Sequence, residues 1–280
     1  MTDTRESRGK LYVVGTPIGN LDDLSARARD VLAKANIIAA EDTRHTRGLL
    51  SRIGVESRLI AYHEHNETER VTALLAELEQ GRSVALVSDA GTPLISDPGW
   101  RLVAAARAAG IAVIPVPGPC AAIAALSVAG VPTDHFVFEG FLPRRDGARA
   151  ERLDSLRREQ RTIVFYEAVH RIAETLAALR SAFGGERRAA LARELTKTHE
   201  QIATGTLAEL EARLDSSIPL LGEFVLVVAG AGATSPDEAE AQRVYELLAT
   251  ELAPDKALKL AVAITGVARN TLYRLTRTKN

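Results

Sequence analysis

Residues 87–99 read "VSDAGTPLISDPG" and begin at the last residue of the apolar run Val84–Val87. Two prolines and two glycines in so short a segment exclude the interior of a helix or a strand. A helix-like pattern begins just after it, near Trp100. A buried strand, a loop rich in Gly and Pro, and a helix form a unit typical of α/β folds, in which ligands bind at the carboxyl ends of the strands.

The same unit repeats along the first half of the chain. Short apolar segments alternate with amphipathic ones, which predicts a mostly parallel sheet with helices on both faces. The expected strands are 11–14, 37–40, 58–62, 84–87 and 112–115, and the expected helices lie near 24–34, 69–80 and 100–109.

Three further loops have unusual chemistry, and two of them also contain both Gly and Pro. "GTPIGNLDD" (15–23) follows the first expected strand, "EDTRHTR" (41–47) follows the second, and "PGPCAA" (117–122) opens the element after the fifth. Gly and Pro together make a rigid backbone that a ligand can approach without meeting a Cβ atom. Any one loop alone is typical of a structural turn. Four of them at corresponding ends of one sheet predict a shared ligand site.

The second half predicts a separate α/β domain followed by a helical tail. A small-residue helix is expected in "VPGPCAAIAALSVAG", strands at 136–141, 162–166, 189–192 and 224–228, and a helix at 170–180, while "PRRDGARAER" (143–152) is expected to be an exposed loop. "AGAGATSPDE" (229–238) has the composition of a linker, and helices are expected at 240–252, 255–263 and 271–278. We therefore expect an N-terminal lobe at 1–116, a C-terminal lobe at 117–230 and a helix-turn-helix-like, RNA-binding tail at 231–280.

Composition narrows the classes of protein and partner. The chain has 280 residues, 46% of them hydrophobic, and a net charge of −1. A nearly neutral chain has no global basic field for nucleic acid, so any basic patch must be local. The single cysteine, Cys120, excludes an internal disulfide framework and a Cys-based zinc site. A polar N-terminus and the lack of an apolar run of about 20 residues favour a cytoplasmic protein without a membrane span.

Five motifs together resemble a known family. "LYVVGTPIGNLDDLS", "AAEDTRHTRGLL", "VSDAGTPLISDPG", "VPGPCAAIAAL" and "VFYEAVHR" resemble the tetrapyrrole methylase-like (class III) methyltransferases. Within that family they are similar to the branch that methylates a ribose 2′-hydroxyl of a cytidine in 16S rRNA. The resemblance implies a two-lobed α/β fold, S-adenosylmethionine as methyl donor, 16S rRNA or the 30S subunit as partner, and a homodimer.

The resemblance also implies which residues contact the methyl donor. They are Pro17, Ala90, Gly91, Thr92, Ile95, Cys120, Ala121, Glu167 and Thr196. An acidic Glu167 departs from the apolar residue of porphyrin-methylating relatives, which leaves an acceptor-side role open.

Methyl transfer to a ribose hydroxyl requires alignment of the two substrates and a base or a cation near the hydroxyl. The candidates are Asp42, His63, Glu67, Glu167, Glu194 and Lys197. We expect Lys197 and Glu167 to act at the acceptor, with Asp42 as a further candidate.

Each candidate also has a structural interpretation. Asp42 is suited to cap the following helix, and Arg44 to pair with it. Glu194 and Lys197, three residues apart, are suited to form a surface ion pair. The spacing of His63 and His65 is compatible with a metal site, but without a supporting carboxylate pattern we expect no metal.

Contacts with RNA are expected at local basic residues. The candidates are Arg44, Arg144, Arg145, Arg269, Arg274 and Arg277. Two alternatives remain open: a methyltransferase of the same fold that acts on a porphyrinoid or a protein side chain, and a non-catalytic RNA-binding module. The intact donor loops argue against the module.

Overall fold

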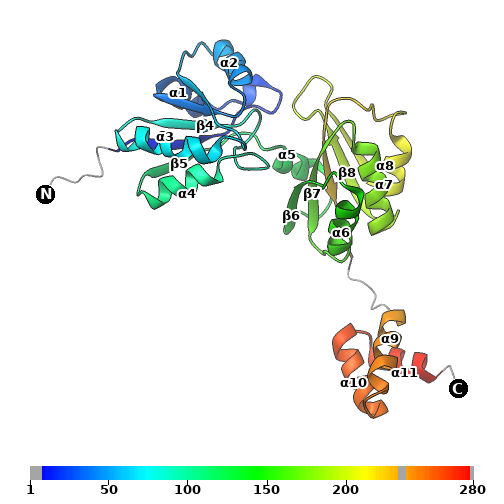
Figure 1. Ribbon diagram of the computed structural model, residues 1–280. Helices are drawn as coiled ribbons and strands as arrows, with labels where there is room; N and C mark the ends of the chain where they lie inside the picture. Colours follow the sequence, from blue (N-terminus) through cyan, green and yellow to red (C-terminus); the bar gives the residue numbers. More distant parts are fainter. Residues whose placement is uncertain (1–7, 233–237, 278–280) are drawn as a thin grey trace. The chain divides into compact units, whose positions relative to one another are not determined.

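A computed structural model of the chain describes residues 8–232 and 238–277 (Figure 1). The chain divides at Gly230 into two compact units. The first unit contains two five-stranded sheets, and the second contains only helices. Within the described residues, no helix is both long enough and apolar enough to cross a membrane.

The first sheet is entirely parallel, with strand order β3-β2-β4-β1-β5. Its strands are β1 (Lys10–Val14), β2 (Ile37–Ala40), β3 (Leu59–Ala61), β4 (Val84–Val87) and β5 (Ala112–Val116), and its helices are α1 (Ala26–Lys34), α2 (Thr43–Arg52), α3 (Glu67–Glu79) and α4 (Trp100–Ala108). Ile37 and Ala39 pack in one core with α3 and α4, whereas Ile38 and Ala40 pack in another with α1 and α2. Both faces of the sheet are therefore covered, and the predicted α/β architecture is confirmed.

The second sheet is mixed, with strand order β6-β7-β10-β8-β9. Its strands are β6 (Phe136–Phe141), β7 (Thr162–Ala168), β8 (Arg188–Arg193), β9 (Gln201–Thr206) and β10 (Glu223–Val228). Only β6 and β7 pair in parallel; the other pairs are antiparallel. Helix α5 (Ala121–Val128) packs with Val164 on one face. Helices α6 (Asp146–Leu156), α7 (Ile172–Phe183) and α8 (Leu207–Arg213) pack with Phe165 on the other.

The expectation of an exposed loop at 143–152 is wrong. Helix α6 begins at Asp146 and buries Arg149, Leu153 and Leu156, which share one face at helical spacing. The Arg149 guanidinium pairs with Asp146 at 2.9 Å. The high charge of the segment concealed this amphipathic period. Strand β9 and helix α8 were also not anticipated.

The second unit is a three-helix domain. Its helices are α9 (Glu238–Ala249), α10 (Pro254–Thr265) and α11 (Arg269–Arg277), close to the predicted segments. Ala241, Leu258, Ala261 and Leu272 are among the buried residues of its core. Gly266, with φ of 71°, ends α10 in the left-handed region, as is common for glycine at helix ends. Residues 1–7, 233–237 and 278–280, which include parts of the predicted linker and the end of the third predicted helix, lie outside the described residues.

Candidate active site

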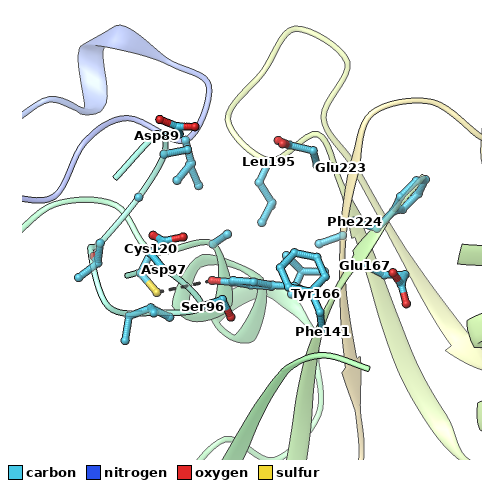
Figure 2. A pocket seen from close by; sticks show the side chains of 18 of the residues that line it. Asp89, Ser96, Asp97, Cys120, Phe141, Tyr166, Glu167, Leu195, Glu223 and Phe224 are labelled. Carbon is cyan, nitrogen blue, oxygen red and sulfur yellow. Dashed lines mark hydrogen bonds between the residues drawn. The ribbon is translucent and has the colours of Figure 1, made fainter. Parts of the chain in front are cut away.

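A cavity of about 340 Å³ is lined by residues from both sheets of the first unit (Figure 2). Its volume lies in the range of small-molecule sites, about 300–1,000 Å³. The first sheet contributes the loops that follow β1, β2, β4 and β5, and the second contributes residues at the ends of β6, β7, β8 and β10. The four loops singled out in the sequence, three of which contain both Gly and Pro, thus meet at one site.

Backbone hydrogen bonds join these loops to one another. The Thr16 N–H donates to the Gly91 carbonyl at 2.8 Å, and the Gly91 N–H donates to the Thr16 carbonyl at 3.1 Å. The Thr92 hydroxyl donates to the Pro119 carbonyl at 3.0 Å. Gly91 has φ of 81°, and a Cβ atom there would lie 3.2 Å from Ile18 Cγ2. Glycine is therefore needed at position 91 for both conformation and space.

Two other backbone features distinguish these loops. A Cβ atom on Gly15 would lie 2.7 Å from the Gly118 Cα atom, so the first and fifth strands end in direct backbone contact. Leu94 and Ser96 have φ of 75° and 67°, a region that non-glycine residues rarely adopt. Such strain persists only where surrounding structure enforces it, and it clusters at functional sites.

Three carboxylates line the same side of the cavity. They belong to Glu41, Asp89 and Asp97, and Asp89 Oδ1 accepts a hydrogen bond from the Asp42 N–H at 2.9 Å. Burial raises the pKa of Asp97 to about 6, and the neighbouring charges of Glu41 and Asp89 add to the rise. Burial, followed by the charge of Asp89, also raises the pKa of Glu41. Like charges held together in this way favour a cationic ligand.

None of these three carboxylates was predicted as a site residue from the sequence. Each lies in one of the motifs "EDTR" and "SDAGTPLISDPG". The sequence signal that could have identified these carboxylates is the repeated placement of acidic residues at strand ends. Their common orientation into one cavity depends on the fold.

Lys197 lines the cavity from the second sheet. Its Nζ atom lies 2.7 Å from Glu194 Oε1 and 2.8 Å from Glu223 Oε2. Burial alone would lower the pKa of Lys197, but its hydrogen bonds to the two carboxylates outweigh this and raise the pKa. Its side chain passes over Gly19, where a Cβ atom would collide with it. Lys197 is therefore a fixed positive charge and not a proton acceptor. The predicted pair with Glu194 is present, at the edge of the cavity.

The side chain of Glu167 points away from the cavity (Figure 2). It is fully buried, accepts hydrogen bonds from the Thr175 hydroxyl at 2.6 Å and the Ala168 N–H at 2.8 Å, and lies 3.6 Å from the Arg171 guanidinium. Neighbouring side chains of a strand point to opposite faces, so Tyr166 faces the cavity and Glu167 does not. This geometry does not support the expected acceptor role of the Glu167 carboxylate.

Asp42 is the N-cap residue of α2. Its Oδ1 atom accepts a hydrogen bond from the Arg44 N–H at 2.7 Å, and its carboxylate pairs with the Arg44 guanidinium at 3.1 Å. Hydrogen bonds from Arg44 lower the pKa of Asp42 to about 2. Asp42 is not among the residues that line the cavity. The geometry therefore favours the capping interpretation over a catalytic role.

Most predicted donor contacts lie at the cavity. Those that line it are Ala90, Gly91, Thr92, Ile95, Cys120 and Ala121, and Glu167 borders it although its carboxylate points away. Pro17 and Thr196 do not, although their neighbours Ile18, Leu195 and Lys197 do. Glu67 is also remote from the chemistry, since its carboxylate accepts hydrogen bonds from the Tyr62 hydroxyl and the Gly99 N–H.

Tyr166 is a central cavity residue that the sequence analysis missed. Its hydroxyl accepts a hydrogen bond from the Ala122 N–H at 3.1 Å, at the start of α5, and lies 4.0 Å from Cys120 Sγ. Burial raises the pKa of Tyr166 above its ordinary value, so the phenol stays protonated. Phe138 and Phe141 contact its ring edge to face. Tyr166 belongs to the motif "VFYEAVHR", which was the available sequence signal for this residue.

The predicted RNA-binding arginines are spread over the two units. Arg44, Arg144 and Arg145 are exposed on the first unit, and Arg269 and Arg274 are exposed on α11 of the second. The side chain of Arg277 lies outside the described residues. Among the side chains that the structure describes, no group of three or more His, Cys, Asp or Glu is arranged to hold a metal ion.

Comparison with known proteins assigns the class. The family model described as "Tetrapyrrole (Corrin/Porphyrin) Methylases" matches residues 10–211, and a model described as "RsmI C-terminal HTH domain" matches residues 235–276. The solved structure of a uroporphyrin-III-C-methyltransferase from Thermus thermophilus is 27% identical, with a TM-score of 0.53, over 79% of this chain and 94% of that one. The chain belongs to the tetrapyrrole methylase family.

Its curated relatives define a narrower group. A protein from Pseudomonas aeruginosa is 54% identical over 96% of both chains, and one from Xylella fastidiosa is 53% identical over 95% of this chain and 98% of that protein. Both are named ribosomal RNA small subunit methyltransferase I. Within the methylase family, the chain is thus a member of the ribosomal RNA small subunit methyltransferase I group.

Proposed function

We propose that this enzyme transfers a methyl group from S-adenosylmethionine to the ribose 2′-hydroxyl of a cytidine in 16S rRNA of the small ribosomal subunit. One observation carries the proposal. Four loops join to form a cavity that has carboxylates on one side and a fixed ammonium group on the other. The names of relatives up to 54% identical over nearly the whole chain support RNA as the substrate.

The cavity fits the methyl donor in size and in charge. S-adenosylmethionine supplies an activated methyl group on a sulfonium ion, and its amino group is a second cation. Glu41, Asp89 and Asp97 provide the negative potential that both charges favour. The backbone of Gly91 can approach the donor closely, since position 91 carries no side chain. Ile95 and Ala121 add apolar surface.

On the acceptor side, Lys197 is the residue best suited to assist the hydroxyl. Its protonated Nζ would stabilise the ribose oxygen as the hydroxyl gives its proton to water, while the bond from that oxygen to the methyl group forms and the bond between the methyl group and sulfur breaks. Glu194 and Glu223 hold the ammonium group in place. In this scheme Glu167 shapes the second sheet through its contacts with Thr175 and Arg171 and takes no part in proton transfer.

Binding of RNA is assigned to local basic surfaces. Arg44, Arg144 and Arg145 would contact phosphates on the first unit, and Arg269, Arg274 and Arg277 would do so on the tail, which matches a helix-turn-helix family model. Phosphate contacts give affinity and position but carry no sequence information. Selection of one cytidine would therefore rest on the shape of the RNA and on an unstacked nucleotide.

The decisive experiment supplies labelled S-adenosylmethionine with 30S subunits, free 16S rRNA, a porphyrinoid macrocycle, or no acceptor. We expect label in RNA only, and digestion followed by mass spectrometry should identify 2′-O-methylcytidine. Label in the macrocycle instead of RNA would contradict the proposal. Donor binding without any transfer would favour the non-catalytic module.

We also propose that the enzyme acts in the cytoplasm, where ribosomal subunits are assembled, and that it does so as a homodimer. Large apolar side chains exposed on the first unit, such as those of Trp100, Ile123 and Val128, support an interface between copies. Sedimentation analysis would test this, and a monomer at micromolar concentration would contradict the dimer.

A further inference from the structure

A β-bulge lies on β6 next to the cavity. In the parallel pairing of β6 with β7, Phe138 is opposite Val164 and Phe141 is opposite Tyr166, so β6 uses one residue more than β7 over this interval. A one-residue shift reverses which face each following side chain occupies. Phe138 and Phe141 consequently lie on the same face, and both contact the ring of Tyr166, with centroid separations of 5.0 and 5.8 Å.

An ion pair and a glycine account for this bulge. The Arg152 guanidinium of α6 forms two hydrogen bonds of 2.8 Å to the largely buried carboxylate of Glu139. Gly140 has φ of 65°, and a Cβ atom there would lie 2.8 Å from Ser96 Oγ of the loop after β4. The glycine therefore provides the bulge conformation and leaves room for that loop. Bulges of this kind often redirect a side chain next to an active site.

The bulge leaves the ring of Phe141 at the edge of the cavity. Phe141 lines the cavity and is 54% exposed, and Figure 2 shows it beside Tyr166. The Tyr166 ring contacts the Phe141 ring edge to face and leaves much of the Phe141 surface uncovered. An exposed phenylalanine that a bulge directs to the rim of a charged cavity is suited to bind a flat apolar partner.

We propose that Phe141 is the surface on which the base of the target nucleotide stacks. The inference rests on the proposed function, because a ribose whose 2′-hydroxyl reaches Lys197 carries a base that has left its own stack. Unstacked bases in RNA-binding proteins commonly stack on aromatic side chains, whatever their sequence. Phe141 and Lys197 both line the cavity from the second sheet, opposite the carboxylates and the donor loop of the first.

The test compares Phe141→Ala, Phe141→Leu and Phe141→Trp with a control, Phe136→Ala. Phe136 is an exposed phenylalanine at the other end of β6 that does not line the cavity. Single-turnover methylation is measured over a range of 30S concentrations with saturating donor, and donor affinity is measured by calorimetry. Since stacking of a base on an aromatic ring accounts for about 5- to 150-fold in affinity, Ala and Leu should weaken apparent RNA binding by a factor in that range. Trp and the control should stay within about twofold of wild type.

Three results would overturn the inference. Unchanged RNA binding by Phe141→Ala would show that no base stacks there, and equal binding by the Leu variant would show that only apolar bulk matters. A loss of donor affinity with unchanged RNA binding would assign Phe141 to the donor. In each case methylation by the wild-type enzyme would still support the proposed function. If the wild-type enzyme binds donor but never methylates RNA, the proposed function itself fails, and this inference fails with it.

Discussion

The two sheets of the first unit build their sides of the cavity in different ways. The parallel sheet contributes loops, whose backbone and carboxylates surround one side. The mixed sheet contributes side chains: Tyr166 and Phe141 lie on its strands, and Lys197 lies in the loop between β8 and β9. A loop rich in Gly and Pro can be recognised from composition, since its conformation depends on those residues. The orientation of a strand side chain depends on pairing and register, which composition does not reveal.

The largest expected effect concerns the loop side. Gly91→Val should abolish binding of S-adenosylmethionine at every concentration that calorimetry reaches, because valine is strained at φ of 81° and its side chain would contact Ile18. Gly48→Ala in α2 is the matched control, since a Cβ atom there has open space. Circular dichroism should show both variants folded. A folded Gly91→Val protein with wild-type donor affinity would remove this loop from the donor site.

Lys197→Met tests the side of the cavity that the mixed sheet and its loops build. The rate of single-turnover methylation with saturating donor and RNA should fall by about 10²- to 10⁴-fold, as is typical when a group that assists the reacting atom is lost. Lys34→Met removes an exposed lysine that pairs with Asp30 and should leave the rate unchanged. A rate within about threefold of wild type for Lys197→Met, far from the loss expected for such a group, would mean that Lys197 is structural.

Substitutions in the helical tail should affect RNA binding and leave donor binding unchanged. Replacing Arg269, Arg274 and Arg277 with Ala should weaken RNA binding and reduce the slope of log affinity against log salt by about 0.7–0.9 for each phosphate that the variant no longer neutralises. Donor affinity should not change, because the cavity lies in the other unit. Arg144→Ala combined with Arg145→Ala gives the corresponding measurement for the first unit. An unaltered slope for the triple variant would exclude the tail from phosphate binding.

The smallest effect concerns Asp97 and the carboxylate group. Because burial raises its pKa to about 6, donor affinity of the wild-type enzyme should fall severalfold as the pH decreases through that value. The Asp97→Asn variant should bind the donor more weakly than the wild-type enzyme at neutral pH, and its donor affinity should depend less on pH. The loss should be smaller for S-adenosylhomocysteine, which lacks the sulfonium charge. A pH profile that is the same in both proteins would exclude Asp97 as the titrating group.

The same substitution should increase stability at neutral pH. A carboxyl whose pKa is higher in the folded than in the unfolded state, here about 6 against 3.8, favours folding when protonated. This contribution is fully present below pH 3.8 and is lost as the pH rises through about 6. Asp97→Asn should therefore raise the free energy of unfolding at neutral pH by about 1 kcal/mol, after allowance for solvent screening. Urea unfolding at neutral and acidic pH checks this, and an equal gain at both would contradict the assignment.

Much of the fold was predictable because its signals are local. All five strands of the parallel sheet were expected within one residue at each end, and β3 was expected one residue too long at both ends. Helix α6 was missed because its buried face includes Arg149, which ion pairs with Asp146 and Glu174 make suitable for burial. Strand β9 was missed because Ala203 is its only fully buried residue, and helix α8 was missed because it is short and buries only Leu207 and Leu210.

The sequence by itself determined the α/β architecture, the helical tail and the loops that meet at the cavity, because periodicity and Gly and Pro content act over a few residues. Only the tertiary structure decided that Tyr166 faces the cavity while Glu167 turns to Thr175. It also brought Glu41, Asp89 and Asp97 together and placed Phe141 at the rim through a one-residue bulge. These outcomes depend on contacts between segments far apart in the chain, where a shift of a single residue moves a side chain to the opposite face.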